Sequence, residues 1–288
     1  MSVRPTEELQ PQDVLHEPVQ GAFETSHSSS HHQQIALDGL IYLSEVGSTL
    51  HGVSTDATSD DIDEMGITIE PPRCVIGFEQ FDLYEYRTKP VGVRSQAGDI
   101  DRTIYSLRKY AKLLASGNPT VLMPMFAPAD KLRYVHPLGQ VLRENVGHFL
   151  SRQTGQRFLG YLNRQRSRYL DPERTDSTHA SRPELVEAYG WDTKAGYHAL
   201  RLAIQGAELM KHRTITLPME PDRREFLLNV RNGQFTKDQV VTWLESTFVP
   251  LLEHEIEHST LPEQPEWRYI NHLLVHLHQE YWTDHGWV

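Results

Sequence analysis

The sequence predicts an α+β protein in which a small mixed-sheet lobe is followed by an all-helical lobe. Up to about residue 135, short apolar runs typical of strands alternate with a single helical pattern. From residue 136 onward, apolar residues recur at helical spacing and the strand patterns fade. At 288 residues the chain is long enough to build two such lobes, each with its own core.

The first segment, residues 1–34, is predicted to be a disordered tail. It is rich in Pro, Gln, Ser, Glu and His and shows no sustained periodicity. Order is expected to begin near Ile35, so the sheet lobe would span residues 35–135 and the helical lobe residues 136–288.

Within the sheet lobe, strands are expected over 41–45 and 66–70, and a further strand or hairpin within 73–87. The segment 103–116 predicts a helix, because Ile104, Leu107, Tyr110, Ala111 and Leu114 recur at helical spacing. Gly-Asn-Pro at 117–119 would end that helix. The clearest helical patterns of the second lobe lie at 140–150, 158–169, 194–211, 237–257 and 267–282.

Composition excludes several classes of protein. The net charge of −11 argues against a general nucleic-acid coat protein, whose non-specific affinity depends on neutralising phosphates. Cys74 is the only cysteine, so an intrachain disulfide is impossible and a reducing compartment is expected. There is no apolar run of membrane-spanning length and no signal-peptide pattern. We therefore expect a cytoplasmic protein without a membrane partner.

The most informative stretch is 47–66, which contains a Gly-Ser turn, a polar linker and an Asp-x-Asp pair. Successive side chains of a strand point to opposite faces, so Asp61 and Asp63 share a face and can converge on a cation. Mg²⁺ commonly binds through one or two carboxylates together with substrate phosphates. Gly47 would let the backbone approach a phosphate, and the Ser48 hydroxyl could donate to it. Taken alone, the stretch is also compatible with a surface loop rich in turn-forming residues.

The full arrangement is an apolar run (41–43), Gly-Ser, a short gap, Asp-Ile-Asp and a second apolar strand. It resembles the signature of the DNA polymerase β-type nucleotidyltransferase superfamily, most closely the predicted nucleotidyltransferases associated with RNA repair. The resemblance implies a metal-dependent enzyme with Mg²⁺ or Mn²⁺ as cofactor and an active site in the cleft between the lobes. Such an enzyme transfers NMP from an NTP, such as ATP, to an acceptor hydroxyl and releases pyrophosphate.

The resemblance also implies a third carboxylate on the strand that enters the next helix. Counting back from Leu-Arg-Lys at 107–109 selects Asp101, which would complete the metal ligands and catalytic residues begun by Asp61 and Asp63. Asp99 lies on the same face of an extended segment and is the second choice, and Glu85 is the third. Asp101 could instead cap the following helix.

A helical segment of the second lobe carries three polar residues on one face. Lys194, His198 and Arg201 lie at positions i, i+4 and i+7. The family has a similar Lys…Tyr-His…Arg helix, which makes Lys194 and Arg201 candidate phosphate ligands and His198 a candidate substrate contact. His198 could equally be a packed polar residue.

Two alternatives to the transferase remain at this point. One is a non-catalytic nucleotide-binding or regulatory protein of the same fold. The other is a zinc hydrolase, because residues 254–258 read His-Glu-Ile-Glu-His and match the His-Glu-x-x-His helix motif, with Glu280 as a possible third ligand. The sequence leaves open the NTP, the acceptor (a nucleic-acid end, a nucleotide or a protein) and the oligomeric state.

Overall fold

The computed structural model describes residues 25–53, 61–89, 98–170 and 182–288. It has an α+β fold built from a five-stranded mixed sheet and many helices, as the sequence predicts. The chain forms two compact units and passes between them several times. The first unit contains Met1–Leu114, Met123–Phe149 and Glu266–Val288, and the second contains Ala115–Leu122 and Leu150–Pro265. The units therefore differ from the expected lobes, because 136–149 and 266–288 group with the sheet.

The sheet of the first unit has the strand order β3-β4-β2-β1-β5. Its strands are β1 (Leu40–Glu45), β2 (Ile62–Thr68), β3 (Leu83–Arg87), β4 (Ile100–Ser106) and β5 (Leu132–Val135). The central strand β2 and its neighbour β4 are parallel, and every other pair is antiparallel. Parallel β2 and β4 bring their starting residues, which include the expected carboxylates, to one edge of the sheet.

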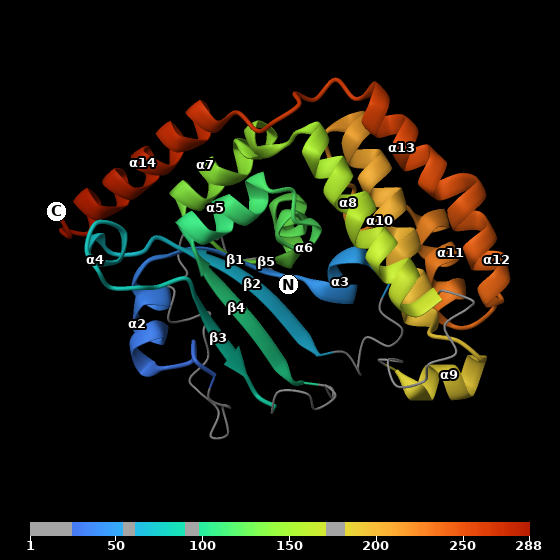
Figure 1. Ribbon diagram of the computed structural model, residues 1–288. Coiled ribbons are helices and arrows are strands. Elements are labelled where there is room, and N and C mark those ends of the chain that lie inside the picture. The colour runs from blue at the N-terminus through green and yellow to red at the C-terminus, as the bar shows by residue number, and fades with distance from the viewer. Residues whose placement is uncertain (1–24, 54–60, 90–97, 171–181) are drawn as a thin grey trace. The chain divides into compact units, whose positions relative to one another are not determined.

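One face of the sheet packs against helix α2 (Ser30–Asp38), as Figure 1 shows. The core on this face consists of buried apolar side chains from α2 and from alternating strand positions, among them Ile35, Leu43, Tyr84, Tyr86 and Ile104. Because side chains alternate along a strand, the intervening residues point to the opposite face. Helix α7 (Pro137–Glu144) packs closely on β1, since a Cβ at Gly139 would lie 2.0 Å from the carbonyl oxygen of Ile41.

Helix α5 (Leu107–Ala115) follows β4 directly, and a buried carboxylate stabilises its beginning. Glu70 Oε2 accepts a hydrogen bond of 3.0 Å from the backbone N–H of Leu107, one of the N–H groups that a helix start leaves without a partner. The C-terminal helix α14 (Trp267–Asp284) belongs to the same unit, and Trp282 Nε1 donates to the carbonyl oxygen of Glu70 at 2.9 Å.

The first unit also contains short helical segments that connect the sheet to its covering helices. They are α3 (Gly47–His51), α4 (Pro72–Val75), η2 (Met123–Phe126), η3 (Ala129–Lys131) and η4 (Val146–Phe149).

Every secondary-structure element among the described residues of the second unit is helical. Its elements are α6 (Pro119–Leu122), α8 (Arg152–Gln165), η5 (Arg166–Leu170), α9 (Pro183–Tyr189), α10 (Thr193–His212), α11 (Pro221–Arg231), α12 (Lys237–Trp243), η7 (Leu244–Phe248) and α13 (Val249–His258). Helix α10 is central and packs against α8, α11 and α13. The close approach of α8 requires Gly155, where a Cβ would lie 2.5 Å from Ile256 and 2.6 Å from Met210 Sδ. The described helices contain none that is long and apolar enough to cross a membrane.

The helix expected over 103–116 begins four residues later than predicted. Residues 103–106 are the end of β4, which pairs with β2 along its whole length. Ile104 fits the helical spacing. However, Arg102, Ile104 and Ser106 are all buried, and this spacing of two residues is that of a strand. Pairing with β2 decides between the two periods, and no local pattern contains that information.

Two further expectations need correction. The sequence predicts that residues 30–34 belong to the disordered tail, but they form the first turns of α2, where the Ser29 hydroxyl accepts from the backbone N–H of His32 at 3.2 Å. Within 73–87 only Leu83–Arg87 is a strand, because 72–75 forms the short helix α4. Pro71 and Pro72 favour that helix start, since proline lacks the N–H that the first turn leaves without a partner.

Candidate active site

The Gly-Ser turn lies against the Asp-x-Asp strand. Gly47 has a left-handed φ of +76°, and a Cβ there would lie only 2.3 Å from Asp63 Oδ2. The preceding Val46 N–H donates to the carbonyl oxygen of Asp63 at 2.8 Å. The linker 54–60 lies outside the described residues. A side chain at position 47 would thus be strained in the left-handed region and would force the Asp63 carboxylate to shift.

Asp63 and Asp101 are register partners in the parallel ladder of β2 and β4. Paired residues of neighbouring strands point to the same face, so these two carboxylates lie side by side on the face opposite α2. Asp61 precedes β2 by one residue and has the same parity as Asp63, which places it on the same face. The strands therefore place the three carboxylates selected from the sequence on one face of the sheet.

The two alternatives to Asp101 lie nearby. Asp99 comes two residues before Asp101, and its carbonyl oxygen accepts from the Ile62 N–H at 2.7 Å, which extends the β2–β4 ladder. Glu85 on β3 is the register partner of Thr103, one pair further along the sheet. Of the three candidates, only Asp101 is the direct neighbour of Asp63.

A basic segment at the end of β3, residues 87–89, contacts these carboxylates. Arg87 Nε lies 3.3 Å from Asp101 Oδ1, and Lys89 Nζ lies 3.7 Å from Asp61 Oδ2. Sequence reasoning missed this segment, whose only local signal is a basic residue on each side of Thr88. The sheet reveals it, because Arg87 is the register partner of Asp101.

The donor set fits a hard divalent cation. The carboxylates offer only oxygen, the donor type that Mg²⁺ and Mn²⁺ prefer. Within the described residues, however, no three acidic, histidine or cysteine side chains are gathered closely enough to hold a metal ion. The Asp61 and Asp101 side chains are instead paired with Lys89 and Arg87.

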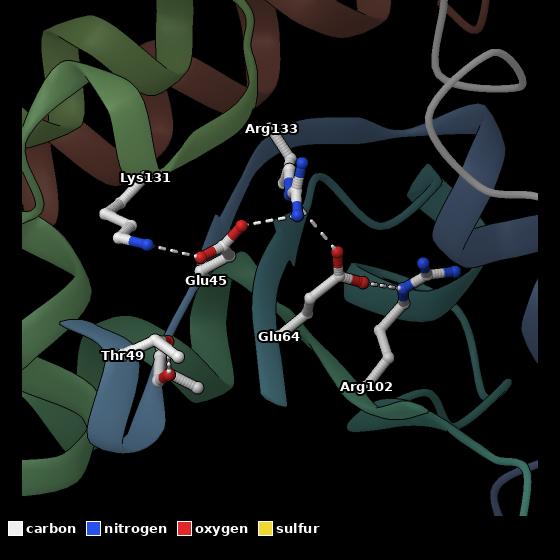
Figure 2. Close-up of polar contacts among 7 residues, drawn as sticks. Glu45, Thr49, Glu64, Arg102, Lys131 and Arg133 are labelled. Carbon is white, nitrogen blue, oxygen red and sulfur yellow. Dashed lines mark hydrogen bonds and ion pairs between the residues drawn. The ribbon is translucent and has the colours of Figure 1, made fainter. Parts of the chain in front are cut away.

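A second charge network crosses the sheet near the same edge (Figure 2). Lys131 Nζ contacts Glu45 Oε2 at 2.8 Å, and Arg133 contacts both Glu45 and, at 3.7 Å, Glu64. Arg102 Nε lies 2.6 Å from Glu64 Oε2. Glu64 and Arg102 directly follow the two aspartates in sequence, so this network lies on the face opposite the carboxylates.

The network fixes the strands that carry the carboxylates, since it links β5, β1, β2 and β4. Glu64 and Arg102 are nearly inaccessible to solvent. Removing one partner of a buried ion pair costs roughly 3–5 kcal/mol, because the other charge is left buried without compensation. The network therefore holds β2 and β4 in the register that pairs Asp63 with Asp101.

In the second unit, α10 carries Lys194, His198 and Arg201, as expected. The Arg201 guanidinium lies over the Tyr197 ring at 6.0 Å, and Arg231, from the end of α11, lies over the same ring at 5.9 Å. The Tyr197 and His198 rings are 4.8 Å apart. Arg231 is a basic residue of this cluster that helical spacing could not reveal, because it comes from another helix.

The cluster determines the protonation of His198. Burial, followed by the charges of Arg201 and Lys194, lowers the pKa of His198 well below 6.5. Arg182 contributes in the same direction, although it also pairs with Asp192 at 3.1 Å. His198 is therefore neutral at pH 7, and the charges of Lys194, Arg201 and Arg231 make the cluster suited to an anion.

The predicted site residues thus fall into two sets. Gly47, Ser48, Asp61, Asp63 and Asp101 lie together in the first unit, and Lys194, His198 and Arg201 lie in the second.

The His-Glu-x-x-His pattern lies on α13, where His254 and His258 are exposed and their rings are 4.1 Å apart. Glu280, the expected third ligand, pairs with His276 at 2.9 Å on α14. No third donor joins the two histidines among the residues that the structure describes.

Comparisons with known proteins identify the family. The model of the RNA repair pathway DNA polymerase beta family matches residues 15–276. An uncharacterized 38.9 kDa protein of Enterobacteria phage T4, from the nrdC-mobD intergenic region, is 26% identical over 125 residues. That match covers 43% of this chain and 36% of the phage protein, so the chain spans well under half of that relative's length.

Among solved structures, a nucleotidyltransferase-like protein of Exiguobacterium sibiricum 255-15 aligns over 79% of this chain and 72% of its own. Its identity to this chain is 12% and the TM-score is 0.29. The family match covers most of the sequence and confirms the resemblance drawn from the motifs. The chain therefore belongs to the RNA repair pathway DNA polymerase beta family.

Proposed function

We propose that the protein is a metal-dependent nucleotidyltransferase that transfers NMP from an NTP to an acceptor hydroxyl and releases pyrophosphate. The observation that carries the proposal is the direct pairing of Asp63 with Asp101 on parallel strands beside Gly47. Asp61, Asp63 and Asp101 would hold the Mg²⁺ or Mn²⁺. A protein that only binds nucleotide has little need for a pair of metal-ligating carboxylates such as Asp61 and Asp63.

In the reaction, the acceptor oxygen forms a bond to the α-phosphorus and the bond from that phosphorus to the bridging β-phosphate oxygen breaks. Pyrophosphate leaves with that electron pair, and a carboxylate of the site or water takes the acceptor proton. The bound cation would supply positive charge that stabilises the attacking and leaving oxygens. Ser48 and the Gly47 backbone would orient the β- and γ-phosphates next to Asp63.

The basic cluster of the second unit is by itself suited to bind phosphate groups. Lys194 and Arg201 are candidate phosphate ligands by family resemblance, and Arg231 adds a third cation at the same tyrosine ring. His198, neutral at pH 7, can donate one hydrogen bond and accept another, which suits contact with a hydroxyl or a base. The acceptor, whether nucleic acid, nucleotide or protein, is not defined by these residues.

The central test is Asp63→Asn, which removes a metal-ligand charge with almost no change in volume. We expect transfer from an α-labelled NTP in Mg²⁺ or Mn²⁺ to be lost while the fold is retained. Asp82→Asn is the matched control, because Asp82 is an exposed acid that pairs with Lys109 at 3.1 Å. Asp101→Asn should impair transfer far more than Asp99→Asn or Glu85→Gln. Full activity of the Asp63 variant would overturn the proposal.

One observation favours the non-catalytic alternative, namely the ion pairs that engage Asp61 and Asp101. A regulatory protein would bind NTP stoichiometrically, but it would release no pyrophosphate with any acceptor. Measuring NTP binding and pyrophosphate release on the same preparation separates the two functions.

A further inference from the structure

The segment Arg87–Thr88–Lys89 contacts four acidic side chains. Arg87 pairs with Asp101 and, at 4.0 Å, with Glu85 Oε1. Lys89 pairs with Asp61, and the Thr88 hydroxyl donates to Asp99 Oδ1 at 3.1 Å. None of the sequence motifs includes this segment. Its position arises from the antiparallel pairing of β3 with β4.

The backbone of the segment is fixed, whereas its two cationic side chains can move. The Thr88 N–H donates to the carbonyl oxygen of Ile100 at 3.1 Å, and the Ile100 N–H donates to the Thr88 hydroxyl at 2.9 Å. These bonds continue the β3–β4 ladder past Arg87. Arg and Lys have long side chains with several rotatable bonds, so their charged ends can exchange partners while the backbone stays in place.

Electrostatics explains why the two cations engage the carboxylates. Asp61, Asp63 and Asp101 share one face, and their like charges repel one another. The Lys89 side chain is only 13% exposed and that of Arg87 is 25% exposed, so both charges need a nearby counter-ion. Each group therefore neutralises the other before any substrate is present.

We propose that Arg87 and Lys89 each exchange one negatively charged partner for another when substrate binds. In the substrate-free protein, Arg87 pairs with Asp101 and Lys89 pairs with Asp61. When the carboxylates bind the divalent cation, the two basic side chains pair with phosphate oxygens of the nucleotide instead. This inference rests on the proposed function, because it assumes that these carboxylates are the metal ligands. It assigns to the two residues a role in substrate binding that the family motifs do not contain.

The exchange predicts opposite effects on two binding equilibria. In Arg87→Gln or Lys89→Gln, a carboxylate loses its competing cation, so Mn²⁺ alone should bind about fivefold more tightly, the size of a partly exposed ion pair. Inorganic tripolyphosphate in the presence of Mg²⁺ should bind about tenfold more weakly, because a charge-assisted hydrogen bond is lost. A residue that merely supports the fold would weaken both.

The experiment measures free Mn²⁺ by electron paramagnetic resonance and tripolyphosphate binding by calorimetry on the full chain. Arg87→Lys and Lys89→Arg keep the charge and should restore both affinities toward wild type. Arg73→Gln is the matched control, since Arg73 pairs with Glu79 at 2.6 Å and not with Asp61, Asp63 or Asp101. It should leave both equilibria unchanged.

The outcomes distinguish this inference from the proposed function. Mn²⁺ binding that depends on Asp63 but is unchanged or weakened in both Gln variants overturns the exchange and leaves the proposed function standing. Unchanged tripolyphosphate affinity in both variants also overturns the exchange. Failure of the wild-type protein to bind Mn²⁺, or binding that Asp63→Asn does not reduce, overturns the two proposals together.

Discussion

Gly47 has a left-handed backbone conformation and lies in close contact with the Asp63 carboxylate. A side chain at this position would have two consequences of different kinds. Strain in the left-handed region costs roughly 1–2 kcal/mol and lowers stability. Displacement of Asp63 would alter the geometry of the carboxylates. The two consequences can be separated, because stability reports the strain and activity reports the displacement.

We therefore expect Gly47→Ala to reduce transfer by about 100-fold, the typical effect of misplacing a reacting group by about 1 Å. Gly286→Ala is the matched control, because Gly286 also has a positive φ (+64°) but has nothing within 4 Å of an added Cβ. Both variants should lose a similar amount of stability in urea unfolding, and only Gly47→Ala should lose activity. Equal activity of the two variants would show that Gly47 serves the turn alone.

At the scale of single elements, the first three turns of α10 place Lys194 and Arg201 near His198. The folded-state pKa of His198 lies below 6.5, so the unfolded chain binds a proton that the folded chain rejects. The contribution of His198 to stability is therefore complete above pH 6.5. It declines as the pH falls from 6.5 to the folded-state pKa.

Lys194→Met should raise the pKa of His198 toward 6.5, because one of the repelling charges is removed. The pKa should still remain below 6.5, since burial is its largest cause. Lys211→Met is the matched control at the other end of α10, where Lys211 lies 3.9 Å from Glu255. Nuclear magnetic resonance titration of the His198 ring measures the shift. The loss of stability between pH 7.5 and 5.5 should be smaller in Lys194→Met than in the control. An unchanged pKa of His198 in Lys194→Met would contradict the inference that the Lys194 charge lowers this pKa.

At the scale of the whole molecule, the chain returns to the first unit with α14 after building most of the second. Six side chains of α14 are buried, namely Ile270, Leu273, Leu277, His278, Tyr281 and Trp282. Tyr281 donates to the carbonyl oxygen of Asp38 at 2.5 Å. The helix thus packs on the first unit, although the last strand of its sheet ends more than 130 residues earlier in the sequence.

Removing α14 should unfold the first unit. Burying each of five large apolar side chains contributes roughly 1.5–3 kcal/mol, about 10 kcal/mol together, which is comparable with the whole net stability of a domain. We expect a chain that ends at Pro265 to lose protection of the β-sheet amides in hydrogen exchange. Val275→Ser, at an exposed position of the same helix, should leave protection unchanged. Native-like protection without α14 would show that the sheet is stable alone.

The sequence alone determined the family, the α+β class and most of the helices. Asp61 and Asp63 could be found because a strand has a period of two, and Lys194, His198 and Arg201 because a helix face repeats every three to four residues. These periods are local, so residues close in sequence can be assigned to one face without knowledge of the fold. Asp101 could be selected only by family resemblance.

The tertiary structure decided what depends on contacts distant in sequence. Pairing of β4 with β2 turned Thr103–Ser106 into strand and made Asp101 the neighbour of Asp63. Pairing of β3 with β4 brought Arg87 to the same carboxylate, and packing of α11 brought Arg231 to Tyr197. Strand order and helix packing are set by burial over the whole chain, and no window of neighbouring residues contains that information.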